Sequence, residues 1–411
     1  MSKALHKQFR QSPVFDKYFM GFSLYDPGSG TVIHEINSDK YFTPASNTKL
    51  FTFYASVKYL GDSIQALKYV NKGDSLIFWG TGDPSFLHPD LHQNEKVFNF
   101  LKNQSGVLVF SGQNYFNQRF GPGWAWDDYP YYYSVETASF PVYGNTVRFS
   151  AAPFNTLRVS PEVFTDSVQH KSANHSPRPR IIRAEHSNRF YFHPHQLPRD
   201  TTVIPLKYSM PTLIHLLQDT LGRHVSHQSL PIDPASKTLY SIPADSVYKI
   251  MLQESDNFLA EQLLLLVGAA INDSLHTSKT ITYLQDSLLS NLPDKPIWVD
   301  GSGLSRYNLF TPRTMVKLLE NIYQSVPEDR LFQLMPAGGV NGTIASWYEG
   351  EKPYIFAKTG TLSNNHCLSG YLITASGKRL IFSFMHNNYP FGSSVTKKAM
   401  APILAFIRAN Y

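Results

Sequence analysis

The chain of 411 residues is poor in features that mark several classes of protein. Its single cysteine, Cys367, has no second thiol with which to form an intrachain disulfide. The longest apolar stretch runs from 263 to 271, which is typical of a buried helix and is far below the roughly 18 residues of a membrane span. The histidines match no metal-ligand spacing, so no metal is expected. These absences exclude an intrachain disulfide framework and argue against a helical membrane protein.

Two further absences bear on location and partners. The first ten residues carry charge but no apolar segment of an export signal follows them. A cytoplasmic protein, or an exported one whose signal is not present in this chain, would both fit. The net charge of +6 suits an anionic polymer such as cell-wall material, and it would also suit nucleic acid. Nothing resembles a nucleic-acid-binding motif, so we expect no nucleic-acid partner.

The composition indicates a folded protein of two or three domains. Apolar residues make up 42% of the chain and charged residues only 17%, which is enough to build a sizeable core. The 27 prolines and 24 glycines favour a loop-rich α/β or α+β protein over a helical repeat or a disordered chain.

The first candidate for chemistry is the pair Ser46 and Lys49. Pro44 precedes them and an apolar-rich run follows, which predicts a loop entering a helix with Ser46 near its first turn. Residues three apart share a helix face, so the amine could take the serine proton if burial or cationic neighbours lower its pKa. Alone, the pattern also fits a helix-capping serine followed by a solvated lysine.

Two later segments complete a set. Ser255-Asp-Asn257 and Lys358-Thr-Gly360 follow in that order. Ser-x-x-Lys, Ser-Asp-Asn and Lys-Thr-Gly together mark penicillin-binding proteins and class A β-lactamases. Each tripeptide is common by itself, whereas all three in order and in suitable local contexts form a specific signal. Asp256 is expected to start a helix and not to act in catalysis.

Periodicity and turn residues predict secondary structure around these motifs. The expected strands and helices are a β-hairpin at 20–36, strands at 75–79, 107–110, 355–361, 368–374 and 379–385, and helices at 211–221, from 245 onward, at 311–324 and at 393–409.

Two other segments are open to more than one interpretation. The aromatic loop 121–128 is either a packed surface loop or a binding wall that carries Asp127 and Asp128, and the first is favoured. The segment 170–200 is rich in histidine and arginine. Solvated strand faces are its expected structure, and a metal site is not favoured.

Longer segments resemble one family. They are Pro44-Ala-Ser-Asn-Thr-Lys-Leu50, Gly80-Thr-Gly-Asp-Pro84, Trp124-Ala-Trp-Asp-Asp128, Ser255 to Glu261, Asp300-Gly-Ser-Gly-Leu-Ser-Arg306, Asn341-Gly-Thr343 and Ala357-Lys-Thr-Gly-Thr361. The chain resembles the low-molecular-mass class C penicillin-binding proteins over roughly 20–400, most weakly at 150–240. These are D-alanyl-D-alanine carboxypeptidase/endopeptidases of the penicillin-binding protein 4 type, peptidase family S13.

The resemblance implies an α+β fold. A penicillin-binding-protein/β-lactamase-like transpeptidase domain, an antiparallel sheet flanked by helices, would be formed by 1–65 and 240–411. The long interval between Ser46 and Ser255 fits the β-rich insertion of this family, here 66–239, which would form one or two extra domains.

The resemblance also implies roles for catalytic residues. Ser46 would attack the carbonyl of the penultimate D-alanine and form an acyl-enzyme, with Lys49 taking its proton. Lys358 would lower the pKa of Lys49 by like-charge repulsion. Ser255 would relay a proton to the leaving amine, and Asn257 would hold Lys49 and the substrate peptide.

Substrate binding is expected on three parts of the chain. The strand residues Lys358, Thr359, Gly360 and Thr361 would hold the terminal carboxylate. The backbone amides of Ser46 and Thr361 would form the oxyanion hole, where each donor is worth on the order of 3 kcal/mol of barrier. Asp128 would hold the free amine of the stem-peptide side chain.

The function implied is a penicillin-sensitive serine carboxypeptidase/endopeptidase acting on peptidoglycan stem peptides, with β-lactam antibiotics as inhibitors and no cofactor. The alternatives are a β-lactamase or esterase on the same fold, and a catalytically silent peptidoglycan-binding scaffold. The substrate class implies a periplasmic, extracytoplasmic location. Peripheral association with membrane or cell wall, and the oligomeric state, are left open.

Overall fold

The computed structural model describes residues 2–91, 95–171, 181–192, 197–198 and 200–411. Within these ranges no helix is long and apolar enough to cross a membrane. The described residues also contain no group of three or more histidine, cysteine or acidic side chains that could hold a metal ion.

An antiparallel sheet joins the two ends of the chain. Its strand order is β14-β15-β16-β1-β2, and β1 pairs with β16 with Phe22 opposite Phe384. The strands are β1 (Phe19–Asp26), β2 (Thr31–Ile36), β14 (Ile355–Leu362), β15 (Asn365–Ile373) and β16 (Arg379–Asn387). The hairpin expected at 20–36 and the strands expected at 355–361, 368–374 and 379–385 are therefore confirmed.

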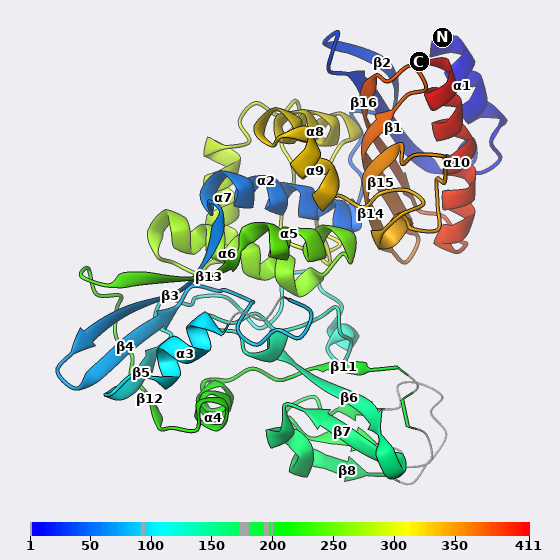
Figure 1. The fold of residues 1–411 in the computed structure, drawn as a ribbon. Helices are drawn as coiled ribbons and strands as arrows, with labels where there is room; N and C mark the ends of the chain where they lie inside the picture. Colours follow the sequence, from blue (N-terminus) through cyan, green and yellow to red (C-terminus); the bar gives the residue numbers. More distant parts are fainter. Residues whose placement is uncertain (1, 92–94, 172–180, 193–196, 199) are drawn as a thin grey trace.

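Helices cover both faces of this sheet (Figure 1). The terminal helices α1 (Ser2–Gln11) and α10 (Ser393–Asn410) pack together on one face and bury Phe9 and Leu404 there. On the other face lie the remaining helices of this part of the chain, which are α2 (Lys49–Tyr59), α5 (Ala244–Gln253), α6 (Asn257–Asn272), α7 (Thr277–Ser287), α8 (Pro312–Ser325) and α9 (Glu328–Leu334).

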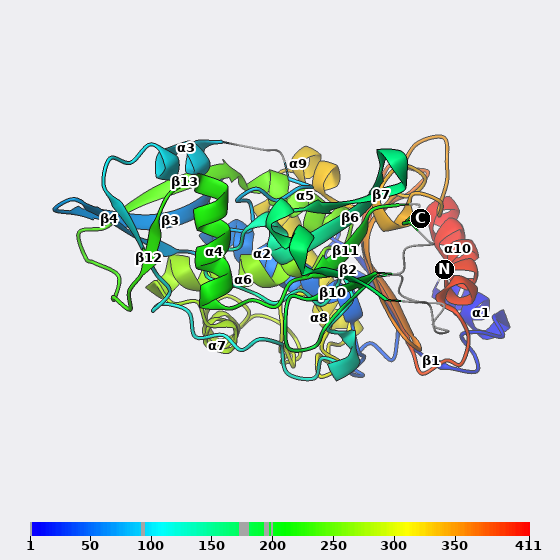
Figure 2. The ribbon, with the colours of Figure 1, turned by 90° about the horizontal axis from the view of Figure 1, so that it is seen from below.

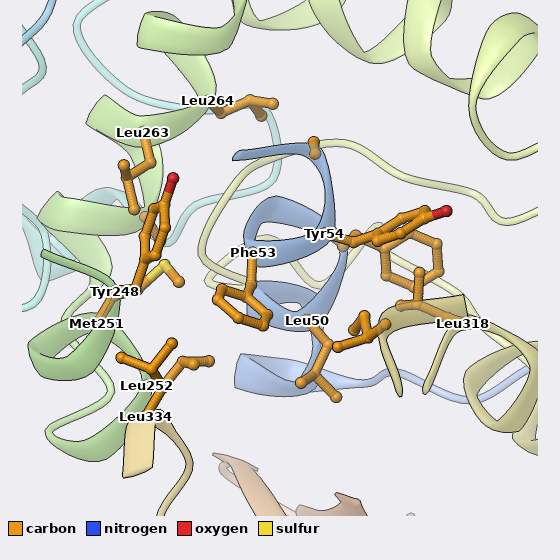
Figure 3. Close-up of a cluster of buried hydrophobic side chains, with 14 of the residues drawn as sticks. Leu50, Phe53, Tyr54, Tyr248, Met251, Leu252, Leu263, Leu264, Leu318 and Leu334 are labelled. Carbon is orange, nitrogen blue, oxygen red and sulfur yellow. The ribbon is translucent and has the colours of Figure 1, made fainter. Parts of the chain in front are cut away.

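Helix α2 lies at the centre of these helices. Every residue from 49 to 56 is buried, and the apolar side chains Leu50, Phe53 and Tyr54 point to different neighbours (Figure 3). Met251 of α5 and Leu318 of α8 belong to the same core. A helix buried on all sides is held rigidly by packing, so the polar residues at its start have fixed positions.

A second five-stranded sheet, β12-β5-β4-β3-β13, lies beside the helices (Figures 1 and 2). It is mixed, because β4 with β5 and β5 with β12 are parallel pairs. Its strands are β3 (Ser63–Lys72), β4 (Ser75–Gly80), β5 (Val107–Ser111), β12 (Val225–His227) and β13 (Lys237–Pro243). The helices that accompany it are α3 (Lys96–Lys102) and α4 (Met210–Leu221). The strands expected at 75–79 and 107–110 and the helix expected at 211–221 are confirmed.

Two small three-stranded sheets form a further lobe, with their own apolar cluster around Phe149 and Phe190. Their strands are β6 (Thr146–Ala152), β7 (Thr156–Ser160), β8 (Val168–His170), β9 (Ile181–Arg183), β10 (Phe190–Phe192) and β11 (Thr202–Pro205).

The interpretation of 170–200 as solvated strand faces is wrong for Arg183, which is fully buried. Its Nε donates to the carbonyl of Pro205 over 2.7 Å and its Nη1 to that of Ala184 over 2.8 Å, so backbone oxygens replace water. His170 and His186 are exposed as expected. His175, Arg178, Arg180, His193, His195 and Arg199 lie outside the described residues.

The division into 1–65 with 240–411 and an insertion at 66–239 stays a prediction. The apolar clusters favour it, because Ile64 and Ile242 belong to the helical core whereas Ala66 belongs to the core of the mixed sheet. Leu91 and Val135 lie in the predicted insertion but pack into the helical core.

Candidate active site

Ser46 lies in a tight turn at the start of the buried helix. The 3₁₀ turn Ala45–Thr48 runs directly into α2, as the sequence predicted. Ala45 has a left-handed φ of 48°, and the hydroxyl of Thr48 donates to the carbonyl of Ala45 over 2.9 Å. Gly303 packs so closely that a Cβ there would lie 1.9 Å from this carbonyl oxygen. Only glycine fits, and the loop at 303 therefore supports the serine turn.

Lys49 is fully buried and uses all three of its hydrogens. Its Nζ lies 2.9 Å from the Oγ of Ser46, 2.6 Å from the Oδ1 of Asn257 and 2.8 Å from the carbonyl oxygen of Ser302. Each partner comes from a different part of the chain. The amine is thus fixed beside the serine hydroxyl.

Burial lowers the pKa of Lys49 to about 8. The carboxylates of Asp256, Asp300 and Glu261 act in the opposite direction, because negative charge favours the ammonium form. The balance leaves an amine that is partly neutral near neutral pH, as a general base requires.

Two buried carboxylates hold the loop that supports Lys49. Glu261 accepts hydrogen bonds from the backbone amides of Gly301 and Ser302 at 3.0 and 2.8 Å. Asp300 accepts from the amides of Gly303 and Ser305 at 2.8 and 2.7 Å. Burial and the nearby Asp300 raise the pKa of Glu261 to about 7. Both residues stand in the motifs quoted from the sequence, but sequence reasoning gave neither a role.

Ser255 and Lys358 form a second pair. The Nζ of Lys358 donates to the Oγ of Ser255 over 2.8 Å and to the carbonyl of Thr359 over 2.9 Å. Ser255 has a left-handed φ of 61°, a strained conformation that the surrounding structure must hold. Asp256 caps α6 by accepting from the amide of Leu259 over 2.8 Å, as predicted.

The expected lowering of the Lys49 pKa by Lys358 stays a prediction. The pKa of Lys49 falls because the group is buried, and its electrostatic neighbours are carboxylates. Lys358 is also fully buried, and its pKa falls well below the usual value through burial and through the charge of Lys49. Because the repulsion between two ammonium groups is mutual, it disfavours the state in which both lysines are charged.

The edge strand β14 lies against the serine turn. The Nδ2 of Asn47 donates to the carbonyl of Lys358 over 2.9 Å. A Cβ at Gly360 would lie 2.3 Å from the carbonyl oxygen of Pro44 and 3.0 Å from the backbone nitrogen of Ser46. The absence of a side chain at 360 thus lets the strand approach the amide of Ser46.

The two threonines of this strand each have a partner that sequence reasoning missed. The hydroxyl of Thr359 lies 2.6 Å from that of Thr343, which belongs to the Asn341-Gly-Thr343 motif. The hydroxyl of Thr361 lies 2.8 Å from the Nδ1 of His366 on β15. Thr359 is buried and Thr361 is exposed.

Asp128 is linked to the other predicted residues through Tyr133. The hydroxyl of Tyr133 donates to the Oδ1 of Asp128 over 2.9 Å, and its carbonyl accepts from the Nδ2 of Asn257 over 2.9 Å. Trp124 of the same loop donates to Asp300 over 2.9 Å. Trp126 of the loop is exposed, so the choice between a packed surface loop and a binding wall stays open. Asp128 is connected to Asn257 through the single residue Tyr133. Sequence spacing alone gives no signal for Tyr133.

An open hollow of about 520 Å³ lies next to the end of β14. It is lined by Tyr18, Arg306, Ser363, Asn364, Asn365, Asn388, Tyr389 and Pro390. Arg306 belongs to the Asp300 to Arg306 motif, and Ser363 follows the last residue of β14.

The sequence model of the D-Ala-D-Ala carboxypeptidase 3 (S13) family matches residues 1–410. The chain belongs to this family. The match includes the three short motifs and also the long segments between them.

Curated relatives of this S13 chain are similar over most of their length. D-alanyl-D-alanine carboxypeptidase DacB of Haemophilus influenzae is 25% identical over 435 residues, covering 95% of this chain and 90% of the relative. Penicillin-sensitive carboxypeptidase A of Dictyostelium discoideum is 24% identical over 436 residues, covering 89% and 82%.

Solved structures share the fold. Penicillin-binding protein 4 from H. influenzae superposes with a TM-score of 0.76 over 99% of both chains at 20% identity. Bd3459, a predatory peptidoglycan endopeptidase from Bdellovibrio bacteriovorus, has a TM-score of 0.53 over 95% of this chain and 93% of its own at 16% identity. The predicted α+β penicillin-binding-protein fold with β-rich additions is confirmed.

Proposed function

We propose that this S13 protein is a penicillin-sensitive serine D-Ala-D-Ala carboxypeptidase/endopeptidase that cleaves peptidoglycan stem peptides through an acyl-enzyme on Ser46. The observation that carries the proposal is the buried amine of Lys49, 2.9 Å from the hydroxyl of Ser46. Family membership supports the reaction class.

Acylation uses Lys49 in its neutral form. Its Nζ lone pair accepts the proton of Ser46 while Oγ bonds to the carbonyl carbon of the penultimate D-alanine. The peptide C–N bond then breaks, and the terminal D-alanine leaves as an amine that receives a proton through Ser255. Lys358, whose Nζ donates to the Oγ of Ser255 over 2.8 Å, holds that hydroxyl in place on the path. Water then releases the acyl group with the same base.

Substrate recognition is assigned to the edge strand and the aromatic loop. The terminal carboxylate binds Lys358, Thr359 and Thr361, alongside Gly360, and the backbone amides of Ser46 and Thr361 hold the oxyanion. The close approach of Gly360 to the Ser46 amide supports this arrangement. Asn257 orients Lys49 and the substrate peptide. Asp128 takes the free amine of the stem-peptide side chain, and its link through Tyr133 to Asn257 supports this.

Inhibitors and location follow from the same reasoning. A relative in Dictyostelium is described as penicillin-sensitive, and a complex with a β-lactam has been solved for H. influenzae penicillin-binding protein 4. We therefore propose β-lactams as acylating inhibitors.

Because peptidoglycan lies outside the cytoplasmic membrane, we propose an extracytoplasmic, periplasmic location.

The test is the intact mass of the protein after incubation with benzylpenicillin, with Ser46→Ala beside it and Ser56→Ala, in the helix α2 that follows, as a control. A stable adduct of one penicillin on the parent and the control, and none on Ser46→Ala, is expected. An adduct that hydrolyses quickly would instead favour a β-lactamase. Absence of an adduct on every form would favour a silent scaffold.

A further inference from the structure

Thr361 and His366 are directly opposite each other on the antiparallel pair β14 and β15. The Oγ1 of Thr361 lies 2.8 Å from the Nδ1 of His366. The imidazole is fully buried, whereas the threonine is exposed at the edge of the sheet. The Oγ1 of Thr361 therefore contacts a buried imidazole on one side and is open on the other side to a ligand that binds along β14.

The buried ring carries a single proton. Burial is the main cause that lowers the pKa of His366 to about 3, and the charges of Lys397, His386 and Lys358 act in the same direction. The imidazole is therefore neutral at physiological pH, and the proton must be on one nitrogen or the other.

The surroundings of the Nε2 of His366 determine which nitrogen carries the proton. The Nε2 of His366 is buried and has no hydrogen-bond partner among the residues that the structure describes. A buried N–H without an acceptor is rarer in proteins than an acceptor that lacks a donor. The proton is accordingly on Nδ1, and Nδ1–H donates to the oxygen of Thr361.

The direction of this hydrogen bond determines where the Thr361 hydroxyl can donate its own hydrogen. An oxygen that accepts from Nδ1 must turn its own hydrogen elsewhere, and the exposed side of Thr361 is the open direction. Thr359 differs, because its hydroxyl is buried and is paired with the Thr343 hydroxyl, where either can donate.

We propose that His366 is a positioning residue that makes the hydroxyl of Thr361 a donor toward the carboxylate of the ligand. The inference rests on the proposed function, in which Thr361 binds that carboxylate. It adds the tautomer and the residue that set the direction of the bond. The histidine itself touches no ligand and exchanges no proton.

His386 provides a matched control. It is directly opposite His366 on β16, is equally buried, and its Nδ1 lies 3.1 Å from the hydroxyl of Thr396. Replacing either histidine by leucine disturbs the same layer under the sheet. Only the change at 366 removes a donor to Thr361.

The experiment compares the second-order rate of acylation by benzylpenicillin with that by its methyl ester, which has no carboxylate charge. For the free acid, His366→Leu is expected to slow acylation roughly three- to tenfold, because Thr361 keeps its hydroxyl but loses the neutral hydrogen bond that orients it. The ester rate should change little. His366→Asn, whose amide can donate from a position near Nδ1, should restore most of the loss, and His386→Leu should leave the ratio of the two rates unchanged.

A double variant completes the test. Thr361→Val with His366→Leu is expected to react no more slowly with the acid than Thr361→Val alone, because both changes remove one interaction. The inference would be overturned if the factors by which the two single variants slow acylation multiplied in the double variant, or if His366→Leu slowed acid and ester equally. Either result would leave the proposed function intact. A parent protein that forms no adduct would overturn both.

Discussion

The surroundings of Lys49 change its pKa in two opposite directions. Burial favours the neutral amine, whereas three carboxylates favour the ammonium ion. The outcome, a pKa of about 8, lies close to the pH at which enzymes commonly work. The side chain is held by Ser46, Asn257 and Ser302, so its position does not depend on a bound substrate.

A pH profile follows from this value. Below pH 8 the neutral fraction of Lys49 falls about tenfold for each pH unit, and the rate of acylation by benzylpenicillin should fall with it. The rate should therefore rise with pH and level off above about 8. Time courses of adduct formation by intact mass between pH 5.5 and 9 measure this. A flat profile would exclude Lys49 as the base.

Replacing Lys49 by arginine separates charge from basicity. The guanidinium keeps the positive charge but cannot be deprotonated in a protein, so no adduct should form within hours. Lys58 is in the last turn of the same helix, and Lys58→Arg is the control. An active Lys49→Arg variant would contradict the assigned role.

At the residue scale, sequence predicts the groups that belong to short motifs and misses those that act through the fold. Ser46 and Lys49 are three residues apart on one turn, so their contact is local. Tyr133 and His366 act through hydrogen bonds made by a loop and by strand register, and neither leaves a short-range pattern. Glu261 was visible in a motif, but its backbone partners lie about 40 residues away.

At the scale of elements, the site depends on close contacts between backbones. Strand β14 approaches the serine turn at Gly360, and the loop that Glu261 holds approaches it at Gly303. The first contact brings the backbone of β14 close to the Ser46 amide, and the second places the Ser302 carbonyl on Lys49.

Gly360→Ala should separate the strand from the turn. The added Cβ would lie 2.3 Å from the carbonyl oxygen of Pro44, so one of the two backbones must move. We expect acylation to slow by about a hundredfold or more, in line with a lost oxyanion donor. Gly392→Ala, where the nearest atom is 3.9 Å away, is the control for the substitution. An unchanged acylation rate would mean that this contact does not shape the site.

Glu261→Gln should alter stability and the pH profile together. The new amide group would face one of two backbone N–H groups, leaving it unpaired at a cost of about 1–3 kcal/mol in the free energy of unfolding. Removing the carboxylate also removes a charge that raises the pKa of Lys49, so the midpoint of the acylation profile should move below 8. Glu254→Gln, an exposed neighbour, should change neither denaturation nor the profile.

The elements themselves were predictable where periodicity was long. The β1–β2 hairpin, the C-terminal meander and helices α4, α8 and α10 appear within a few residues of their predicted bounds. The mixed sheet was not predicted as a unit, because β12 has only three residues and pairs in parallel with β5, far away in sequence. Helix α1 was not predicted either.

At the scale of the whole molecule, the lobe with β6 to β11 leaves and rejoins the chain at one point. The amide of Leu206 donates to the carbonyl of Asn145 over 2.9 Å, so the two ends of the lobe are in contact. The lobe also contacts the residue that follows the aromatic loop, since the guanidinium carbon of Arg183 lies 5.4 Å from the centre of the Tyr129 ring.

A variant in which two glycines replace residues 146–205 should therefore fold and react with benzylpenicillin. Its acylation rate should stay within about threefold of the parent rate, because the lobe lies outside the hydrogen bonds around Ser46. Its Tm should fall, since Leu206 and Leu216 lose their apolar cover. Circular dichroism and adduct mass check these points, with Ser46→Ala in the shortened chain as the control. A folded variant that forms no adduct would show that the lobe shapes the site.

The pairing of β3 with β13 also bears on the history of the chain. Ser63 is opposite Pro243 and Tyr69 is opposite Lys237, so everything between these strands leaves and returns at neighbouring points. Residues can be inserted or deleted between β3 and β13 during evolution while Ser46 and Ser255 keep their separation in space. The number of residues between the first two motifs can therefore change without moving Ser46 away from Ser255, so this number says little about the chemistry of the site.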